Sequence, residues 1–364
     1  MANLRTLQAI NNPERISSID VFRGVAILSV VLFHFNGFLP FGFLGVDLFF
    51  IVSGFLVSGI LTRELEEGRK IIFFKFLLQR GFKIWPSYYA FILFGSMLAY
   101  FFYGTTNPEQ LIRFSDLKRY LFFYQNYTGS PTHWSFDHLW SLCVEMHFYV
   151  LMPIVFGLIQ RSIKENFKVY LIVMSLFLIF LGILFKQLSL ILTTGQDTYA
   201  ATHNRLDSLS WGILLNLISS NYGNKLKEII WARGIFVVLG ICVLAGAIFF
   251  YQNDDSSVVY SKLYFPSIVP FSFFCIMLGL FHCNFSKLTI FRTIAYYSFN
   301  WYLWHPIFVI FITTQLGDSI IGLVTYLLVT FFVSVLFTTL IEEYFLSKRQ
   351  LIISKIFPSK SNMT

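Results

Sequence analysis

Two ionisable residues, Arg23 and His34, lie in one apolar run from Ile19 to Phe43 with ten residues between them. Eleven steps along an α-helix make about 1100°, or three turns plus roughly 20°, so both side chains project from one face. The rise between them is about 16 Å. Because an Arg at the centre of a membrane span costs at least about 2.5 kcal/mol, we interpret this pair as functional. The alternative is that Arg23 extends to the membrane surface and His34 packs inside a bundle.

The two residue types can do different chemistry. An imidazole has an unperturbed pKa near 6.5, so a neutral His34 is a candidate base for taking a proton from an alcohol. The planar guanidinium of Arg23 can bind a phosphate through two hydrogen bonds.

A second pair of cations, Arg80 and Lys83, lies three residues apart at the start of a later apolar run. Such a spacing puts them on adjacent helical turns, where they suit a phosphorylated ligand from the cytosol. They are equally typical of basic residues that only anchor the cytoplasmic end of a span.

Ser141 and Glu145 are spaced i to i+4 and share a helix face. A carboxylate inside a span is costly, so we expect Glu145 to pair with a His or an Arg. It could orient His34, as a carboxylate orients a catalytic imidazole, or form an ion pair between two helices.

Other polar residues occur near the ends of apolar runs. Asp20 lies at the edge of the first run, and Asp207 is expected to cap a helix at whose start Arg205 faces a polar acceptor. His305 directly precedes Pro306, where a kink is expected. We treat Asp20, Ser141, Arg205, Asp207 and His305 as acceptor-side or structural polar residues.

No metal site is expected. His133, His138 and His147 lack a ligand set at zinc spacing. The four cysteines form no CxxC pair, so a disulfide framework is not indicated either.

The composition predicts an all-α, polytopic membrane protein. The 364 residues are 56% hydrophobic and 13% charged, with 45 Phe and a mean hydropathy of +0.67. The net charge of +8 comes from dispersed basic residues, which excludes a nucleic-acid-binding surface. About ten runs approach the length of a span, at 18–38, 43–62, 85–104, 139–159, 169–187, 206–220, 231–251, 262–282, 293–313 and 320–341.

The distribution of basic residues predicts the orientation. With the N-terminus in the cytoplasm, 21 of the 27 Lys and Arg fall on the cytoplasmic side, and six, including Lys186, fall outside. Both termini are then cytoplasmic. We expect a tail at 1–16, a transmembrane domain at 17–345 and a second tail at 346–364. The loop from Thr105 to His138 lies outside and could cap the bundle.

Six motifs occur in the order typical of one family. They are Asp20-Val-Phe-Arg-Gly24 with His34, Gly42-Phe-Leu-Gly-Val-Asp-Leu-Phe-Phe-Ile-Val-Ser-Gly-Phe-Leu56, Arg80-Gly-Phe-Lys83, Leu139-Trp-Ser-Leu-Cys-Val-Glu-Met-His-Phe-Tyr149, Arg205-Leu-Asp-Ser-Leu-x-x-Gly212 and Tyr302-Leu-Trp-His-Pro306. From about 17 to 345 the chain resembles the bacterial membrane acyltransferase-3 family, whose members O-acylate cell-surface polysaccharides. Lys83 departs from the family's Arg-x-x-Arg, so phosphate binding there would depend more on Arg80.

The resemblance implies a function. It implies that His34 is catalytic and that Arg23 is required. From the residues themselves, Glu145 is a second catalytic candidate, and Arg23, Arg80 and Lys83 are expected to bind the donor. The expected reaction moves an acetyl or other acyl group from cytosolic acyl-CoA, most simply acetyl-CoA, to a hydroxyl of a surface glycan or lipid-linked sugar. The expected location is the bacterial inner membrane, and the partners are acyl-CoA, the saccharide and the lipid bilayer.

Two alternatives remain open from the residues. A transporter or flippase of a lipid-linked sugar also uses intramembrane Arg, His and Glu. An acyltransferase that acts on a lipid or a small sugar would use the same chemistry. Aromatic residues, 20% of the chain, do not separate these classes, because they occur both at membrane interfaces and in sugar sites.

Overall fold

The fold is described from a computed structural model, which describes residues 15–104, 111–127, 134–162, 166–192, 199–253 and 258–358 together with residues 10, 12 and 108. Within these ranges all regular secondary structure is helical, as expected. Most of the expected N-terminal tail, the end of the C-terminal tail, parts of the 105–138 loop and His133 lie outside the described residues.

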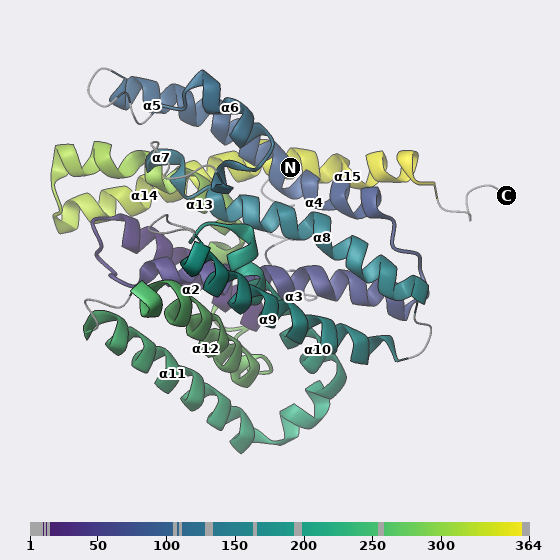
Figure 1. The fold of residues 1–364 in the computed structure, drawn as a ribbon. Helices are drawn as coiled ribbons and strands as arrows, with labels where there is room; N and C mark the ends of the chain where they lie inside the picture. The colour runs from purple at the N-terminus through teal and green to yellow at the C-terminus, as the bar shows by residue number, and fades with distance from the viewer. Residues whose placement is uncertain are drawn as a thin grey trace.

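The long helices that build the bundle are drawn in Figure 1. They are α2 (Ser17–His34), α3 (Gly45–Glu66), α4 (Phe73–Ala90), α8 (Trp140–Ser162), α9 (Phe167–Leu192), α10 (Leu206–Glu228), α11 (Ile230–Asn253), α12 (Phe265–Leu280), α13 (Thr289–Leu316), α14 (Ile320–Phe337) and α15 (Glu343–Ile356).

Shorter elements connect or extend them. They are η1 (Gly42–Leu44), η2 (Phe91–Gly95), α5 (Ser96–Tyr103), α6 (Phe114–Leu121), η4 (Gln125–Tyr127), α7 (Trp134–Asp137), η5 (Thr202–Arg205), η6 (Tyr260–Tyr264) and η7 (Thr338–Glu342).

The polytopic helical architecture is confirmed. Among the described residues, eight helical segments are long and apolar enough to cross a membrane. Helices α10 and α13, 23 and 28 residues long, are not among the eight, although both were expected to span. Their polar residues are buried inside the protein, as with Ser208 and Ser210 of α10 and Asn300 and His305 of α13. Both helices therefore lie in the interior, and lipid contact does not select their composition.

The C-terminal segment differs from the expected tail. After α14 the chain continues through η7 into α15, which ends at Ile356 and packs against α4. Figure 1 shows α15 beside α4, on the opposite side of the bundle from α11 and α12. The sequence did not predict this helix because its residues are too polar for a span.

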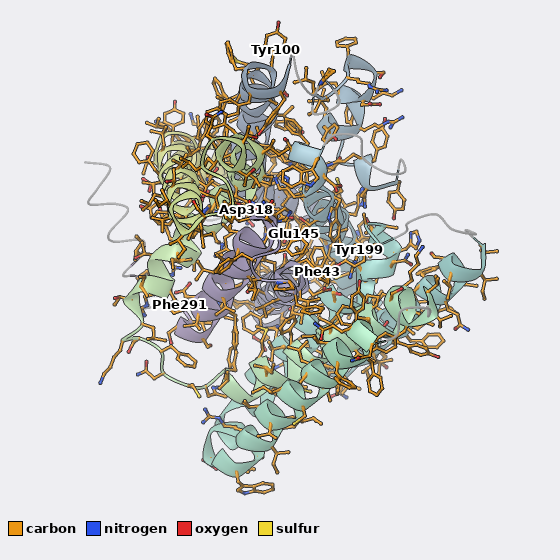
Figure 2. All side chains as sticks on the ribbon, turned by 90° about the vertical axis from the view of Figure 1, so that its left-hand side faces the viewer. Phe43, Tyr100, Glu145, Tyr199, Phe291 and Asp318 are labelled. Atoms are coloured by element: carbon orange, nitrogen blue, oxygen red, sulfur yellow. The ribbon has the colours of Figure 1, made fainter. Side chains whose placement is uncertain are left out.

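Helix α2 is central to the arrangement. It packs against α3 on one side and along α13 on the other, while α3 packs along α10. Figure 2 shows Glu145 of α8 in the middle of the molecule, whereas Tyr100 of α5 lies at its periphery. The polar face of α2, which carries Arg23 and His34, lies against α13: Arg23 contacts Ser298 and His34 contacts His305.

Helices α3 and α10 cross at two glycines. A Cβ atom on Gly54 would lie 2.0 Å from the carbonyl oxygen of Leu209, and one on Gly212 would lie 2.0 Å from that of Ile51. Contacts this short involve backbone atoms, which cannot move aside cheaply. Small residues at such a crossing allow helix backbones in a membrane to approach closely.

The crossing gives a stability prediction. Gly54→Ala should force α3 and α10 apart and lower the stability of the purified protein by about 1–3 kcal/mol, as overpacking does. Thermal unfolding in detergent, followed by size exclusion, measures this loss. Gly157→Ala is the matched control because a Cβ there meets nothing within 4 Å, so its melting temperature should stay the same or rise. Equal melting temperatures for the two variants would contradict the close crossing.

Candidate functional site

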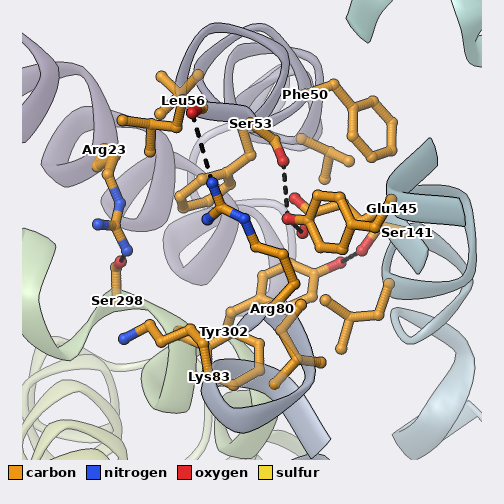
Figure 3. Close-up of a pocket in the computed structure, with 17 residues that line it drawn as sticks. Arg23, Phe50, Ser53, Leu56, Arg80, Lys83, Ser141, Glu145, Ser298 and Tyr302 are labelled. Carbon is orange, nitrogen blue, oxygen red and sulfur yellow. Dashed lines mark hydrogen bonds between the residues drawn. The ribbon is translucent and has the colours of Figure 1, made fainter. Parts of the chain in front are cut away.

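The Arg23 pocket is a cavity between α2, α3, α4, α8 and α13, and Figure 3 shows it in close-up. The Arg23 guanidinium donates a hydrogen bond to the Ser298 hydroxyl at 2.9 Å. Arg80 donates to the Leu56 carbonyl at 3.4 Å, and its guanidinium carbon lies 5.7 Å from the centroid of the Tyr149 ring. Neither guanidinium takes part in the ion pairs found among the described residues. Glu145 lines the same pocket and attracts both guanidinium groups without forming an ion pair with either.

Lys83 lines the same pocket but has a carboxylate partner. It forms an ion pair with Glu342, which also accepts a hydrogen bond from Asn300 at 2.9 Å. Glu342 belongs to η7, so Lys83 ties α4 to the C-terminal helices. No sequence pattern indicated this pairing, because Lys83 and Glu342 lie far apart in the chain.

The structure places Glu145 in the Arg23 pocket and not beside His34. Its carboxylate accepts a hydrogen bond from Tyr149 at 2.8 Å, and the Tyr149 hydroxyl lies 2.9 Å from that of Ser53. Ser141 and Glu145 do share one face of α8, and both line the Arg23 pocket, which does not include His34. The expected orientation of His34 by Glu145 is therefore not seen, because helical spacing sets the direction of a side chain and not its depth.

A second cavity, the His34 pocket, lies at the other end of α2. Aromatic and polar side chains line it: Phe33, His34, Phe43, Val46, Trp134, Asp137, His138, Trp140, Tyr199 and Tyr302. Flat aromatic rings beside a carboxylate and imidazoles form a surface of the kind that binds sugars or other polar rings.

Hydrogen-bond partners assign the tautomer of His305. Pro306 has no N–H, so it cannot bond to the carbonyl of Tyr302 four residues before it. Nδ1 of His305 lies 2.8 Å from this carbonyl and 3.1 Å from that of Trp301. Because a carbonyl only accepts, Nδ1 of His305 carries the proton and its Nε2 is an acceptor. Helix α13 continues through Pro306.

The same reasoning assigns His34. Its Nδ1 lies 2.9 Å from the Val30 carbonyl and 3.3 Å from Nε2 of His305. Both partners are acceptors, so Nδ1 of His34 is the donor and Nε2 of a neutral His34 keeps its lone pair. This nitrogen can take a proton from a group in the His34 pocket.

The two cavities meet at a shared boundary. Val46 and Tyr302 line both of them. The Tyr302 hydroxyl lies 2.7 Å from the Ser141 hydroxyl and donates to the carbonyl of His138 at 2.7 Å. Ser141 thus lies at the boundary, between the cation-lined cavity and the cavity with the histidine.

The remaining predicted residues pair elsewhere. Asp20 pairs with Arg15, whose Nε lies 2.9 Å from the carboxylate, so Asp20 is bound at the edge of α2. Arg205 is buried and does meet polar acceptors: the Tyr199 carbonyl at 2.9 Å and the Asp47 carboxylate at 3.2 Å.

The expectation that Asp207 caps α10 is wrong. The N-cap residue of α10 is Arg205 and makes no side-chain cap hydrogen bond, whereas Asp207 forms a buried ion pair with Lys186. Lys186 was expected in an outer segment, but it lies within α9 and is buried. Two buried charge pairs therefore hold this end of the bundle.

Sequence reasoning assigned no role to Asp47, Tyr149, Ser298, Tyr302 or Glu342. Asp47, Tyr149 and Tyr302 lie within the quoted motifs, which was the available signal. The described residues contain no group of three His, Cys, Asp or Glu that could hold a metal ion.

Comparisons with known proteins agree with these motifs. A family model described as an acyltransferase domain matches residues 16–342. O-acetyltransferase OatA of Staphylococcus aureus strain NCTC 8325 is 25% identical over 362 residues, covering 94% of this chain and 57% of the relative. OatA of strain COL gives the same values. The chain thus spans a little over half the length of these curated relatives. No solved structure matches the chain.

Proposed function

The chain belongs to the membrane acyltransferase-3 family, and we propose that it is an integral-membrane O-acetyltransferase of the bacterial plasma membrane. It moves the acetyl group of cytosolic acetyl-CoA to a hydroxyl of a surface glycan or lipid-linked sugar. The observation that supports this most is the pair of adjoining cavities along α2, one with unpaired cations and one with a histidine whose Nε2 can accept a proton.

The Arg23 pocket is the proposed donor site. The phosphates of CoA need cations that are not already neutralised, and Arg23 and Arg80 meet this condition. The guanidinium fork matches a phosphate through two hydrogen bonds, whereas Lys83 supplies a point charge that Glu342 already attracts. We therefore assign phosphate binding chiefly to the two arginines.

The His34 pocket is the proposed site of transfer. The acetyl thioester reaches it past Val46 and Tyr302, since these residues line both cavities. Nε2 of His34 takes the proton of the acceptor hydroxyl while the oxygen of that hydroxyl bonds to the thioester carbonyl carbon. The C–S bond then breaks, and the proton passes from His34 to the sulfur of CoA.

A two-step route uses the same groups. The neutral Nε2 of His34 can itself bond to the thioester carbonyl carbon, so that the C–S bond breaks and CoA leaves as a thiolate. The sugar hydroxyl oxygen then bonds to the acetyl carbon, the C–N bond breaks to restore neutral His34, and the hydroxyl proton neutralises the thiolate. Trapping labelled acetyl on the purified protein without an acceptor distinguishes this route from direct transfer.

The proposal is tested on His34. Purified protein should transfer label from acetyl-CoA to a saccharide, and His34→Ala should lose about 10²–10⁴ in rate, because the proton acceptor is gone. Expression and membrane insertion should stay near normal. A folded His34→Ala protein that transfers acetyl at the wild-type rate would contradict the role of His34. Sugar transport without any acetyl transfer would contradict the proposed O-acetyltransferase activity.

His305 provides a control for this test. We expect His305→Phe to reduce transfer less than His34→Ala does and to change the pH profile of kcat/KM, because Nδ1 of His34 loses one of its two acceptors and keeps only the Val30 carbonyl. A His305 that only fills space would lower the rate equally at every pH.

The donor site predicts a contrast between two exchanges of cations. Arg23→Lys keeps the charge but loses the fork, so KM for acetyl-CoA should rise clearly. Lys83→Arg keeps the ion pair with Glu342 and should be tolerated. Steady-state kinetics of both variants measure this contrast. An equal rise of KM in the two variants would mean that these positions stabilise the fold and do not bind phosphate.

The charge distribution predicts the sides of the membrane. In intact cells, a cysteine in place of the exposed Lys118 on α6 should react with an impermeant thiol reagent, and one in place of Lys70 should not. The parent chain, with its own four cysteines, sets the background. Labelling at position 70 from outside would move the Arg23 pocket away from cytosolic CoA and overturn the donor assignment.

A further inference from the structure

A third cavity adjoins the His34 pocket. It is about 340 Å³ in volume and lies where η5, α9 and η6 meet, at the same end of the bundle as His34. Tyr199 lines both this cavity and the His34 pocket, so it forms a wall that the two cavities share. A ligand that occupies both must pass the Tyr199 ring.

The lining of this third cavity is cationic. Lys186, Arg205 and Lys262 line it, and none of its described lining residues is a carboxylate. Lys186 pairs with Asp207 and Arg205 pairs with Asp47, and neither of these two carboxylates lines the cavity among its described residues.

Arg205 also has an unused donor. It is 1% exposed; its Nε donates to the Tyr199 carbonyl and its Nη1 to Asp47, whereas its Nη2 is buried without a hydrogen-bond partner. The guanidinium stacks on the Tyr199 ring, with its central carbon 3.6 Å from the ring centroid. A buried donor without a partner costs about 1–3 kcal/mol, which an anion in the cavity would recover.

We infer that the cavity beside Tyr199 binds an anionic group, a carboxylate or a phosphate, of the sugar that accepts the acetyl group. The inference rests on the proposed function, because it takes the His34 pocket as the place of the acceptor hydroxyl. The anion lies against Arg205 and Lys262, and the sugar ring extends past Tyr199 toward His34. The site thus selects an acidic acceptor over a neutral one of the same shape.

Three monosaccharides that share the glucose ring test this selection: glucuronic acid, glucose 6-phosphate and glucose. Their affinities for purified protein are measured by ligand-induced shifts in melting temperature, without acetyl-CoA. We expect the acidic sugars to bind more tightly than glucose. Lys262→Gln should weaken their binding about tenfold or more and leave glucose unaffected, whereas Lys262→Arg should retain it. The acidic sugar whose affinity falls more in Lys262→Gln identifies the preferred anion.

The exposed Lys118→Gln is the matched control, since it removes one positive charge away from the cavity. The inference is overturned if glucose binds wild-type protein as tightly as the acidic sugars do, or if both Lys→Gln variants behave alike. Acetyl transfer is assayed separately with all three sugars. Absence of transfer from a protein that still distinguishes the acidic sugars would count against the proposed function and not against the anion site.

Discussion

The polar stripe along α2 must be satisfied by other helices, because a bilayer offers no hydrogen-bond partners. Helix α13 supplies them at both ends of the stripe: Ser298 accepts from Arg23, and His305 accepts from His34. This requirement explains why α13 is too polar to be recognised as a span. It is a helix selected for its fit to α2, and lipid contact plays a smaller part in its composition.

Buried charge pairs fix the end of the bundle where His34 lies. Arg205 binds Asp47 at the start of α3, and Lys186 binds Asp207 and also donates to the Pro266 carbonyl at 2.9 Å. Removing one partner of such a pair typically costs about 3–5 kcal/mol, because it leaves a buried charge uncompensated. Together with the glycine crossing of α3 and α10, these pairs hold α3, α9, α10 and α12 in one arrangement around the cavities.

The sequence predicted well which face of a helix a side chain occupies, but it predicted poorly how deep in the bundle that side chain lies. Periodicity placed Arg23 and His34 on one face of a helix, and both side chains do meet α13. It also placed Ser141 and Glu145 on one face, and both line the Arg23 pocket, but it could not show that this pocket lies away from His34. For Lys186, hydropathy alone suggested a segment end, since its partner Asp207 lies on another helix. Pairings between helices depend on packing, which a single sequence does not contain.

In the proposed reaction, the donor cations and the base lie apart. About 16 Å of helix separates Arg23 from His34, so Arg23 would bind the donor and would not act on the reacting carbonyl. Binding energy from a remote part of a substrate can hold its reactive end in place. Tyr302, which lines both cavities, and His305 lie on one turn of α13, where Pro306 leaves the Tyr302 carbonyl free to accept from Nδ1 of His305. This one turn therefore contributes both a wall shared by the two cavities and an acceptor for Nδ1 of His34, the proposed base.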